Sequence, residues 1–389
     1  MKLSKHKSVG QTLLRPAFKQ RIALDLNRVL QADNVRRHPM TTLFWECTLR
    51  CNLHCGHCGS DCRVESGVDE LSVADFIHII DGLTPHVDPN KLLVIFTGGE
   101  ALVRQDIEEA GLALYRRGYP WGIVTNGMLL DEKRLESLRR AGLHTATVSL
   151  DGFAEAHNAL RGHPLSYERA WRAIQLLTQA EDLVWDVVTC VNPMNFDSLP
   201  AFRQQLIDAG VKRWRLFSIF PVGRAAENKQ LQLSDSQYYQ MMQFIIETNE
   251  SGEIEAQYGC EGYLGAFEGR TRKQFYQCRA GVNIATILGD GSISACPSIR
   301  FDHKQGNVHH DDLWQVWEER FESYRDRSWA KTGPCADCKS WKYCLGNGMH
   351  LRDDDGKLLV CHLQRLEAGA EALHASGARC PMSRCRLRS

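Results

Sequence analysis

The sequence predicts an α/β protein with parallel strands, followed by a second domain that is organised by cysteines. From about residue 40, six short runs rich in β-branched and aromatic residues alternate with amphipathic stretches. This rhythm indicates β-then-α units joined by right-handed crossovers. The rhythm stops past Val222, and cysteines recur from Cys278 onward. Six units are too few for a closed eight-stranded barrel, so a partial barrel and an open doubly wound sheet both fit the pattern.

Each apolar run is short enough to be a buried strand. Ser72 and Asp75 have the spacing of a helix capping box, and Gly142 and Gly210 stand where a left-handed residue ends a helix. The expected strands are Thr42–Leu49, Leu92–Thr97, Trp121–Thr125, Thr145–Leu150, Val184–Val191 and Arg213–Phe220. The expected helices are Leu71–Leu83, Asp106–Arg117, Asp131–Ala141, Tyr167–Gln179, Asp197–Ala209, 234–249 and Asp312–Asp326.

The chain is expected to divide into four parts. These are an N-terminal extension at 1–40, a barrel at 41–225, a bridging region at 226–277 and a cysteine-rich domain at 278–389. The last expected helix carries apolar residues at helical spacing, which indicates a core face. They are Leu313, Trp314, Val316, Trp317 and Phe321.

Charge and composition exclude several functions. The 47 basic residues balance 47 acidic ones, so there is no electrostatic case for binding nucleic acid or an anionic membrane. The basic N-terminus lacks the apolar run of a signal peptide, and no stretch approaches the length of a membrane span. We therefore expect a cytoplasmic protein, in which the fifteen cysteines should not form disulfides.

Five cysteines lie within the sixteen residues from Cys47 to Cys62, which indicates either a zinc site or an iron–sulfur cluster. Cys51, Cys55 and Cys58 form a CxxxCxxC motif directly after the first expected strand. Three thiolates on one loop can hold three irons of a [4Fe–4S] cluster and leave the fourth iron open. An open position is what a catalytic metal needs, whereas zinc sites more often show paired CxxC motifs or CxxC with two histidines.

This motif resembles that of the radical S-adenosyl-L-methionine (SAM) enzymes. The family pattern has an aromatic residue before its third cysteine, and His57 stands at that position. The second family motif, GGE after the second strand, is present as Gly98, Gly99 and Glu100. The resemblance covers about residues 42–225 and implies a partial (β/α)6 TIM barrel.

The resemblance also implies a SAM-binding site at the carboxyl ends of the strands. The glycines at 98 and 99 would let the backbone approach the methionine part of SAM, and Glu100 would receive its ammonium group. Ser149 and Arg161 would face the ribose and carboxylate of SAM. Asn126, at the end of the third strand, would be a further SAM-binding residue. The implied activity is reductive cleavage of SAM to a 5′-deoxyadenosyl radical, which abstracts hydrogen from a substrate.

The later cysteines resemble the SPASM domain, an iron–sulfur appendage of radical SAM enzymes that mostly modify peptides and proteins. Six of its seven cysteines are present, and Gly348 stands where the seventh is expected. The distal auxiliary cluster would be complete, whereas the nearer one keeps Cys278 and Cys296 and lacks an extra cysteine near Ile284. We expect one auxiliary [4Fe–4S] cluster and leave a second open. The distal set is Cys335, Cys338, Cys344 and Cys361.

Several alternatives stay open at this point. Taken alone, the four distal cysteines also fit a structural zinc site. Cys47 is interpreted as a strand residue and Cys62 as a loop thiol, and Cys260, Cys380 or Cys385 would be substitute ligands of the nearer cluster. No role is given to the other histidines.

The expected substrate is a peptide or protein side chain or backbone carbon, because the motif region resembles a subgroup encoded beside small lipoproteins or precursor peptides. A flavodoxin or ferredoxin is the expected electron donor. The alternatives are a small molecule such as a sugar or cofactor precursor, and a non-catalytic iron–sulfur or zinc protein that binds a partner. Residues 1–40 show no typical peptide-recognition domain, which counts against the peptide.

Overall fold

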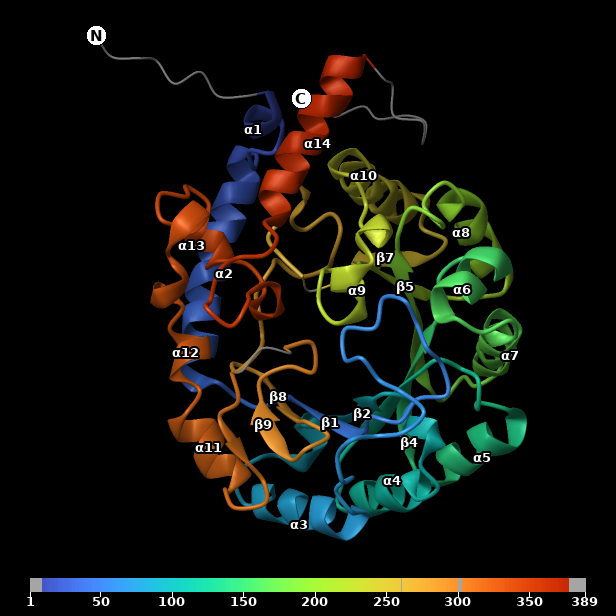
Figure 1. Cartoon of the computed structure of the whole chain (residues 1–389). Helices are drawn as coiled ribbons and strands as arrows, with labels where there is room; N and C mark the ends of the chain where they lie inside the picture. The colour runs from blue at the N-terminus through green and yellow to red at the C-terminus, as the bar shows by residue number, and fades with distance from the viewer. Residues whose placement is uncertain (1–8, 260, 300–302, 378–389) are drawn as a thin grey trace.

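The computed structural model describes residues 9–259, 261–299 and 303–377. Ten strands form one sheet, in the order β10-β9-β8-β1-β2-β3-β4-β5-β6-β7. All neighbours from β8 to β7 are parallel, and β8–β9 and β9–β10 are antiparallel. The sheet is curved, and α3 to α8 lie on its outer side (Figure 1). The prediction of a partial barrel is therefore confirmed.

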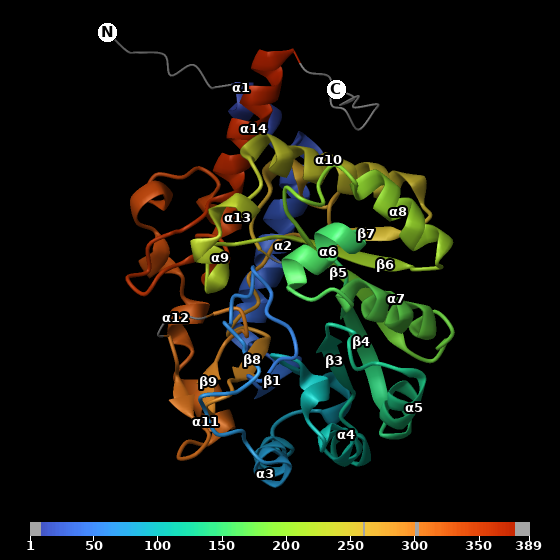
Figure 2. The ribbon, with the colours of Figure 1, turned by 45° about the vertical axis from the view of Figure 1, so that its right-hand side comes forward.

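The six strands expected from the sequence are present. They are β1 (Thr42–Thr48), β2 (Leu93–Gly98), β3 (Trp121–Thr125), β4 (Leu143–Ser149), β5 (Val184–Val191) and β6 (Arg213–Ser218). The inner strands lie beneath α4 (Ile107–Arg116), α5 (Glu132–Arg140), α7 (Ser166–Leu177) and α8 (Leu199–Asp208), as Figure 2 shows. Trp45, Trp121 and Trp214 are fully buried between these layers. The helices α3 (Val73–Leu83) and α6 (Ala154–Arg161) complete this part.

Helix termini follow the local sequence. The Oγ of Ser72 caps α3 by accepting a hydrogen bond from the backbone N of Asp75 at 3.1 Å. Gly142 and Gly210 have positive φ angles at the ends of α5 and α8, as the spacing predicts. The capping box at Ser234 begins α10 (Asp235–Ser251).

The expected helix at Asp312–Asp326 is wrong as a single element. It is divided into α11 (Leu313–Glu319) and α12 (Glu322–Arg325). The helix ends at Arg320, and the turn lets the fully buried Phe321 ring pack between Trp317 and Tyr324. The apolar stripe is core, as expected, with Trp314 only half-buried.

Four short strands extend the sheet beyond the six expected ones. β7 (Glu255–Tyr258) continues it beside β6, and β8 (Ile284–Ile287) pairs with β1. The remaining two are β9 (Ser292–Ser294) and β10 (Gly306–Asn307). Both the bridging region and the cysteine-rich region thus contribute to one sheet, and the four-part division of the chain stays a prediction.

The ends of the described chain pack on each other. The short helix α1 (Val9–Leu13) contacts α14 (His362–Ser376), and α2 (Phe18–Arg37) contacts α13 (Trp341–Cys344). Among the described helices, none is both long enough and apolar enough to cross a membrane. The short helix α9 (Arg224–Glu227) follows β6 near the carboxyl edge of the sheet.

Candidate active site

A loop carrying three cysteines follows β1 at the carboxyl edge of the sheet. Hydrogen bonds from other elements hold its backbone in place. The N–H of Gly56 donates to the carbonyl of Leu160 at 2.9 Å, at the end of α6. The Nε of Arg224 donates to the carbonyl of Cys55 at 2.8 Å. The loop is therefore pinned between α6 and the β6–α9 turn.

The three thiols line one cavity of about 150 Å³. Its other walls come from the carboxyl ends of β2, β3 and β4 and from α6 and α9. The lining residues are Cys51, Leu53, Cys55, His57, Cys58, Cys62, Thr97, Gly98, Gly99, Val124, Thr125, Asn126, Ser149, Arg161 and Arg224. All the residues expected to bind the first cluster and SAM line this cavity, except Glu100, which lies directly beside it.

The two glycines at the end of β2 are required by a close backbone approach. A Cβ at Gly98 would lie 2.1 Å from the carbonyl oxygen of Thr48, and one at Gly99 would lie 2.2 Å from that of Arg50. Gly98 also has φ of 121°, which side-chain-bearing residues rarely adopt. The atoms that exclude a side chain here belong to the end of β1 and the loop after it. The sequence had led us to expect that close approach to SAM alone requires these glycines.

Glu100 is fully buried beneath this glycine pair. Its Oε1 accepts hydrogen bonds from the Thr125 hydroxyl at 2.7 Å and from the backbone N of Leu102 at 3.2 Å. Its Oε2 accepts the backbone N–H of Asn126 at 2.7 Å. Burial raises the pKa of Glu100, and these hydrogen bonds oppose that rise. The carboxylate retains acceptor capacity on Oε2, since each oxygen has two lone pairs.

Asn126 ties the end of β3 to the cysteine loop. Its Nδ2 donates to Oδ1 of Asn52 at 2.8 Å and lies 4.0 Å from the Sγ of Cys51. Its Oδ1 accepts the backbone N–H of Met128 at 2.9 Å. Ser149 ends β4, the strand that pairs with β3, and lines the same cavity.

Arg161 is buried at the end of α6, where it belongs to an ion pair. Its Nε donates to Oδ2 of Asp151 at 2.6 Å, and Asp151 is inaccessible to solvent. Its Nη1 lies 3.9 Å from the Sγ of Cys55. Although burial opposes both charges, Arg161 keeps the pKa of Asp151 below its usual value. The guanidinium thus brings a fixed positive charge to the cysteine loop.

The thiols differ in their electrostatic surroundings. Burial raises the pKa of Cys51 to about 12 and also raises that of Cys55, where Arg161 opposes the effect. A hydrogen bond from the Cys62 thiol lowers the pKa of Cys58 to about 5. Burial lowers the pKa of His57 to about 4, so its ring is neutral, and its buried Nδ1 has no partner among the described residues.

One charged residue of this cavity, Arg224, was missed from the sequence. Arg224 donates to Oδ1 of Asp61 at 2.6 Å and to the carbonyl of Cys62 at 3.1 Å, besides its bond to Cys55. Its position after β6, at a strand's carboxyl end, is the signal that would have found it. Cys62, interpreted as a loop thiol, does lie in the loop after β1, where it lines the cavity beside Cys58. Cys47, by contrast, is a buried residue of β1.

The distal set of cysteines gathers between α13 and α14. Cys335 and Cys338 lie in one turn, Cys344 ends α13, and Cys361 precedes α14. Burial raises the pKa of Cys344 to about 12 and that of Cys361 to about 11, and each thiol is further raised by the others. The N-terminus of a 15-residue helix at Cys361 favours a thiolate there.

The four distal cysteines were expected to bind an auxiliary cluster, with a structural zinc site as the alternative. In the described part of the chain, no three His, Cys, Asp or Glu side chains are arranged to hold one metal ion. A four-iron cube takes its thiolates at separate corners, so its ligands need not converge on one point.

The position of the missing seventh cysteine has no room for a side chain. A Cβ at Gly348 would lie 2.6 Å from the carbonyl oxygen of Glu261 and 2.8 Å from the ring of His350. Cys278 and Cys296 are half-buried near Tyr324, so two thiols of the nearer set are in place. Cys260, Cys380 and Cys385 lie outside the described residues.

Two family models match the chain in this order. The model of the radical SAM superfamily matches residues 45–206, and that of the iron–sulfur cluster-binding SPASM domain matches residues 278–339. This chain is a radical SAM protein with a SPASM domain. The match implies a [4Fe–4S] cluster, SAM and auxiliary iron–sulfur clusters as its cofactors, and the radical SAM superfamily is one of enzymes.

Curated relatives of this radical SAM protein include a heme synthase and a mycofactocin maturase. The AdoMet-dependent heme synthase of Methanosarcina barkeri is 27% identical and covers 78% of this chain and 89% of its own length. The mycofactocin maturase MftC of Mycolicibacterium smegmatis is 29% identical, with 79% and 77% covered. Each of these two relatives therefore aligns with this chain over most of both sequences.

Solved structures share the fold. SuiB of Streptococcus suis, bound to the precursor peptide SuiA, has a TM-score of 0.65 at 17% identity and covers 83% of this chain and 75% of its own. The enzyme anSMEcpe with bound AdoMet has a TM-score of 0.68 at 17% identity, covering 87% and 98%.

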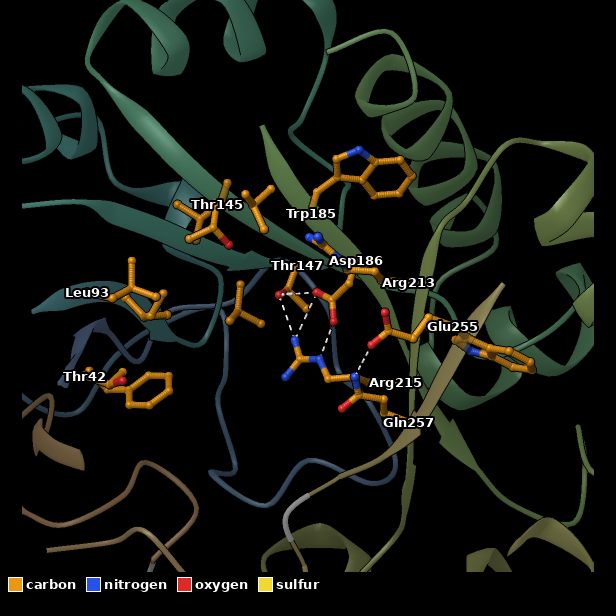
Figure 3. Close-up of a pocket in the computed structure, with 16 residues that line it drawn as sticks. Thr42, Leu93, Thr145, Thr147, Trp185, Asp186, Arg213, Arg215, Glu255 and Gln257 are labelled. Carbon is orange, nitrogen blue, oxygen red and sulfur yellow. Dashed lines mark hydrogen bonds and ion pairs between the residues drawn. The ribbon is translucent and has the colours of Figure 1, made fainter. Parts of the chain in front are cut away.

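A second cavity of about 340 Å³ lies inside the radical SAM barrel at the amino ends of the strands. Figure 3 shows Asp186 of β5 and Arg215 of β6 facing each other within it. Thr147 donates to Oδ1 of Asp186 at 2.7 Å and accepts from Nη2 of Arg215 at 2.9 Å. Val124 lines this cavity and the cysteine cavity, so the two spaces are neighbours along the barrel.

Proposed function

We propose that this chain cleaves SAM reductively and abstracts hydrogen from a peptide or protein substrate, installing a post-translational modification. The observation that carries the proposal is the single cavity in which three thiols, a glycine pair and a buried arginine meet. Cluster and SAM together would supply the one-electron chemistry, which gives a 5′-deoxyadenosyl radical that removes a hydrogen atom from the substrate.

The residues of the cavity would divide the work of binding. Cys51, Cys55 and Cys58 would ligate three irons. Arg161 would stabilise negative charge at Cys55, because its Nη1 lies 3.9 Å from that sulfur. The contacts to SAM would come from His57, Gly98, Gly99, Glu100, Asn126, Ser149 and Arg161.

The neutral His57 ring offers a buried nitrogen without a partner in the described residues, which suits a hydrogen bond to a polar group of SAM. Glu100 would receive the SAM ammonium group through the free lone pair on Oε2. Burial of this carboxylate strengthens such a contact, because charges interact more strongly where the dielectric constant is low.

The distal cysteines would hold one auxiliary cluster. Four protein thiolates leave no open iron, which favours electron transfer or a structural role over substrate binding. Cys278 and Cys296 would belong to a nearer site that lacks a ligand at Gly348. A flavodoxin or ferredoxin would supply the electron that starts the reaction.

A peptide substrate is supported by the relatives MftC and PqqA peptide cyclase and by the fold of SuiB, which was solved with a precursor peptide. The second candidate is an iron tetrapyrrole. It is favoured by the heme synthases and the Fe-coproporphyrin III synthase among the relatives, which this chain matches over 81–89% of their length.

The first experiment measures 5′-deoxyadenosine after anaerobic incubation with SAM and dithionite. We expect Cys55→Ala to abolish its formation. Cys47→Ala is the matched control, because it removes a buried thiol of β1 that does not line the cavity. Wild-type turnover by Cys55→Ala would refute the assignment of the three cysteines.

The substrate class is tested by adding candidate substrates to the same assay. Peptides encoded beside the gene and Fe-coproporphyrin III are compared for stimulation of 5′-deoxyadenosine formation and for a mass change in the substrate. A modified peptide supports the proposal, and a modified porphyrin with unchanged peptides replaces it by the second candidate.

A further inference from the structure

Two of the three sulfurs expected to ligate the first cluster have a nitrogen donor directed at them. The Nδ2 of Asn126 lies 4.0 Å from the Sγ of Cys51, and the Nη1 of Arg161 lies 3.9 Å from the Sγ of Cys55. Both donors belong to buried side chains of the cavity wall. Hydrogen bonds to the ligand sulfurs are among the factors that set the reduction potential of an iron–sulfur cluster. The cavity thus provides these two sulfurs with groups that favour negative charge.

The third sulfur, that of Cys58, has a thiol as its donor. The side chain of Cys62 donates a hydrogen bond to it, and Cys62 is only 4% exposed and lines the same cavity. The carbonyl oxygen of Ser60 also lies 4.0 Å from the Sγ of Cys62. A thiolate at Cys58 is the stronger of the two acceptors, because charge-assisted hydrogen bonds are roughly twice as strong as neutral ones. The thiol proton of Cys62 is therefore directed at Cys58 whenever Cys58 is a thiolate.

The backbone of the loop is held so that Cys62 returns to the other thiols. The N–H of Cys51 donates to the carbonyl of Arg63 at 2.6 Å, which closes the loop on itself. Asp61 has a φ of 49°, a left-handed conformation that redirects the chain just before Cys62. Arg224 donates to Oδ1 of Asp61 at 2.6 Å and to the carbonyl of Cys62 at 3.1 Å. The residues on both sides of Cys62 are therefore held in place.

We propose that Cys62 raises the reduction potential of the first cluster by donating a hydrogen bond to the sulfur of Cys58. This role rests on the proposed function, because it requires a cluster at Cys51, Cys55 and Cys58. Reduction adds negative charge, part of which falls on the ligand sulfurs, so a donor at a sulfur stabilises the reduced state. In this role Cys62 is a positioning residue that acts through Cys58 and is not itself a ligand of the cluster.

Cys62 allows a donor to be removed with little other change. Cys62→Ala removes the thiol alone, and Cys62→Ser keeps a donor of similar size, because a hydroxyl also donates one hydrogen bond. The other two donors offer no such pair of variants. Asn126 is also bonded to Asn52, and Arg161 is ion-paired with Asp151. Their replacement would therefore disturb the cysteine loop and α6 as well as the sulfurs.

Redox titration of the reconstituted full chain, followed by EPR, tests the proposal. We expect Cys62→Ala to make reduction of the first cluster about tenfold less favourable, which for a one-electron couple is a potential lower by about 59 mV. Cys62→Ser should recover most of that shift. Cys47→Ala is the matched control and should keep the wild-type potential, because it removes a buried thiol that does not line the cavity. A parallel titration of Cys55→Ala, which removes a ligand of the first cluster, identifies the signal of the auxiliary cluster.

A wild-type potential in Cys62→Ala would overturn the proposal, as would a potential in Cys62→Ser that is as low as in Cys62→Ala. Loss of about four irons in Cys62→Ala would also overturn it, because Cys62 would then be needed to assemble the cluster. A wild-type protein without a reducible first cluster would refute the proposed function, and this role with it. A first cluster that is present in every Cys62 variant at one common potential would refute this role alone.

Discussion

Arg161 and Asp151 form a buried ion pair at the cavity wall, with the Nε of Arg161 2.6 Å from Oδ2 of Asp151. The pair ties α6 to the segment after β4, which contains Asp151. Oδ1 of Asp151 also accepts the backbone N–H of Cys190 at 2.8 Å, which connects the pair to β5. The charge that reaches Cys55 is therefore oriented by a carboxylate that does not itself line the cavity.

Removing that carboxylate charge should destabilise the protein and weaken catalysis together. We expect Asp151→Asn to lower the free energy of unfolding by about 3 kcal/mol, since it leaves Arg161 buried without its counter-charge. Arg161 would then no longer be held in its orientation toward Cys55, so 5′-deoxyadenosine formation should fall.

The exposed pair of Arg139 and Asp182, joined at 2.8 Å, is the control. Asp182→Asn should cost less than about 1 kcal/mol, because solvent screens that pair. Urea denaturation of both variants measures the difference. Equal costs would mean that burial does not govern the Asp151 pair.

Replacing Gly98 should disrupt the junction between β1 and β2. Gly98→Ala would force a Cβ to within 2.1 Å of the Thr48 carbonyl and would also strain φ, and we expect it to abolish SAM cleavage. Gly210 also has a positive φ, of 84°, but no atom lies within 4 Å of an added Cβ, so Gly210→Ala tests the effect of a positive φ without a clash. That control should lose about 1 kcal/mol of stability and keep activity.

Stability should fall as the pH is lowered from about 6.5 to 4, partly through His157. Burial lowers the pKa of His157 to about 4, and its Nδ1 accepts the backbone N–H of Asp151, which requires the neutral ring. Because the folded pKa lies below the unfolded value, the unfolded state binds the proton first as the pH falls.

Each such histidine contributes a slope of up to about 1.4 kcal/mol per pH unit in that range. His157→Gln should flatten the slope of unfolding free energy against pH by roughly this amount. An unchanged slope, measured by urea denaturation at pH 4.5, 5.5 and 6.5, would show that His157 is protonated in the folded protein.

The iron content should report the auxiliary site separately from the first cluster. Cys338→Ala should lose about four irons and keep the first cluster. Gly348→Cys should not add a cluster, since the new side chain meets Glu261 and His350, and it should lower stability by about 1–3 kcal/mol. A gain of four irons in Gly348→Cys would show that the nearer site can be completed.

The sequence predicted the six long strands, the cysteine loop and the glycine motif, because each has a strong local signal. The strands β7 to β10 were missed, since two to four residues are too few to show a period. Asp151 precedes Gly152, and such a pair is typical of a turn. Its ion pair with Arg161 was missed because the tertiary structure brings the two residues together. The break at Arg320 was missed because the apolar spacing continues through it.

The pairing of β1 with β8 has a consequence for synthesis on the ribosome. Thr42 to Trp45 are bonded on one side by a strand that follows about 240 residues later, at Ile284 to Ile287. Until that later strand emerges, the nascent chain carries an open, apolar parallel edge that invites association with other chains. A truncated chain that stops near residue 225 would keep this exposed edge permanently, so we expect it to aggregate rather than fold as an isolated catalytic half.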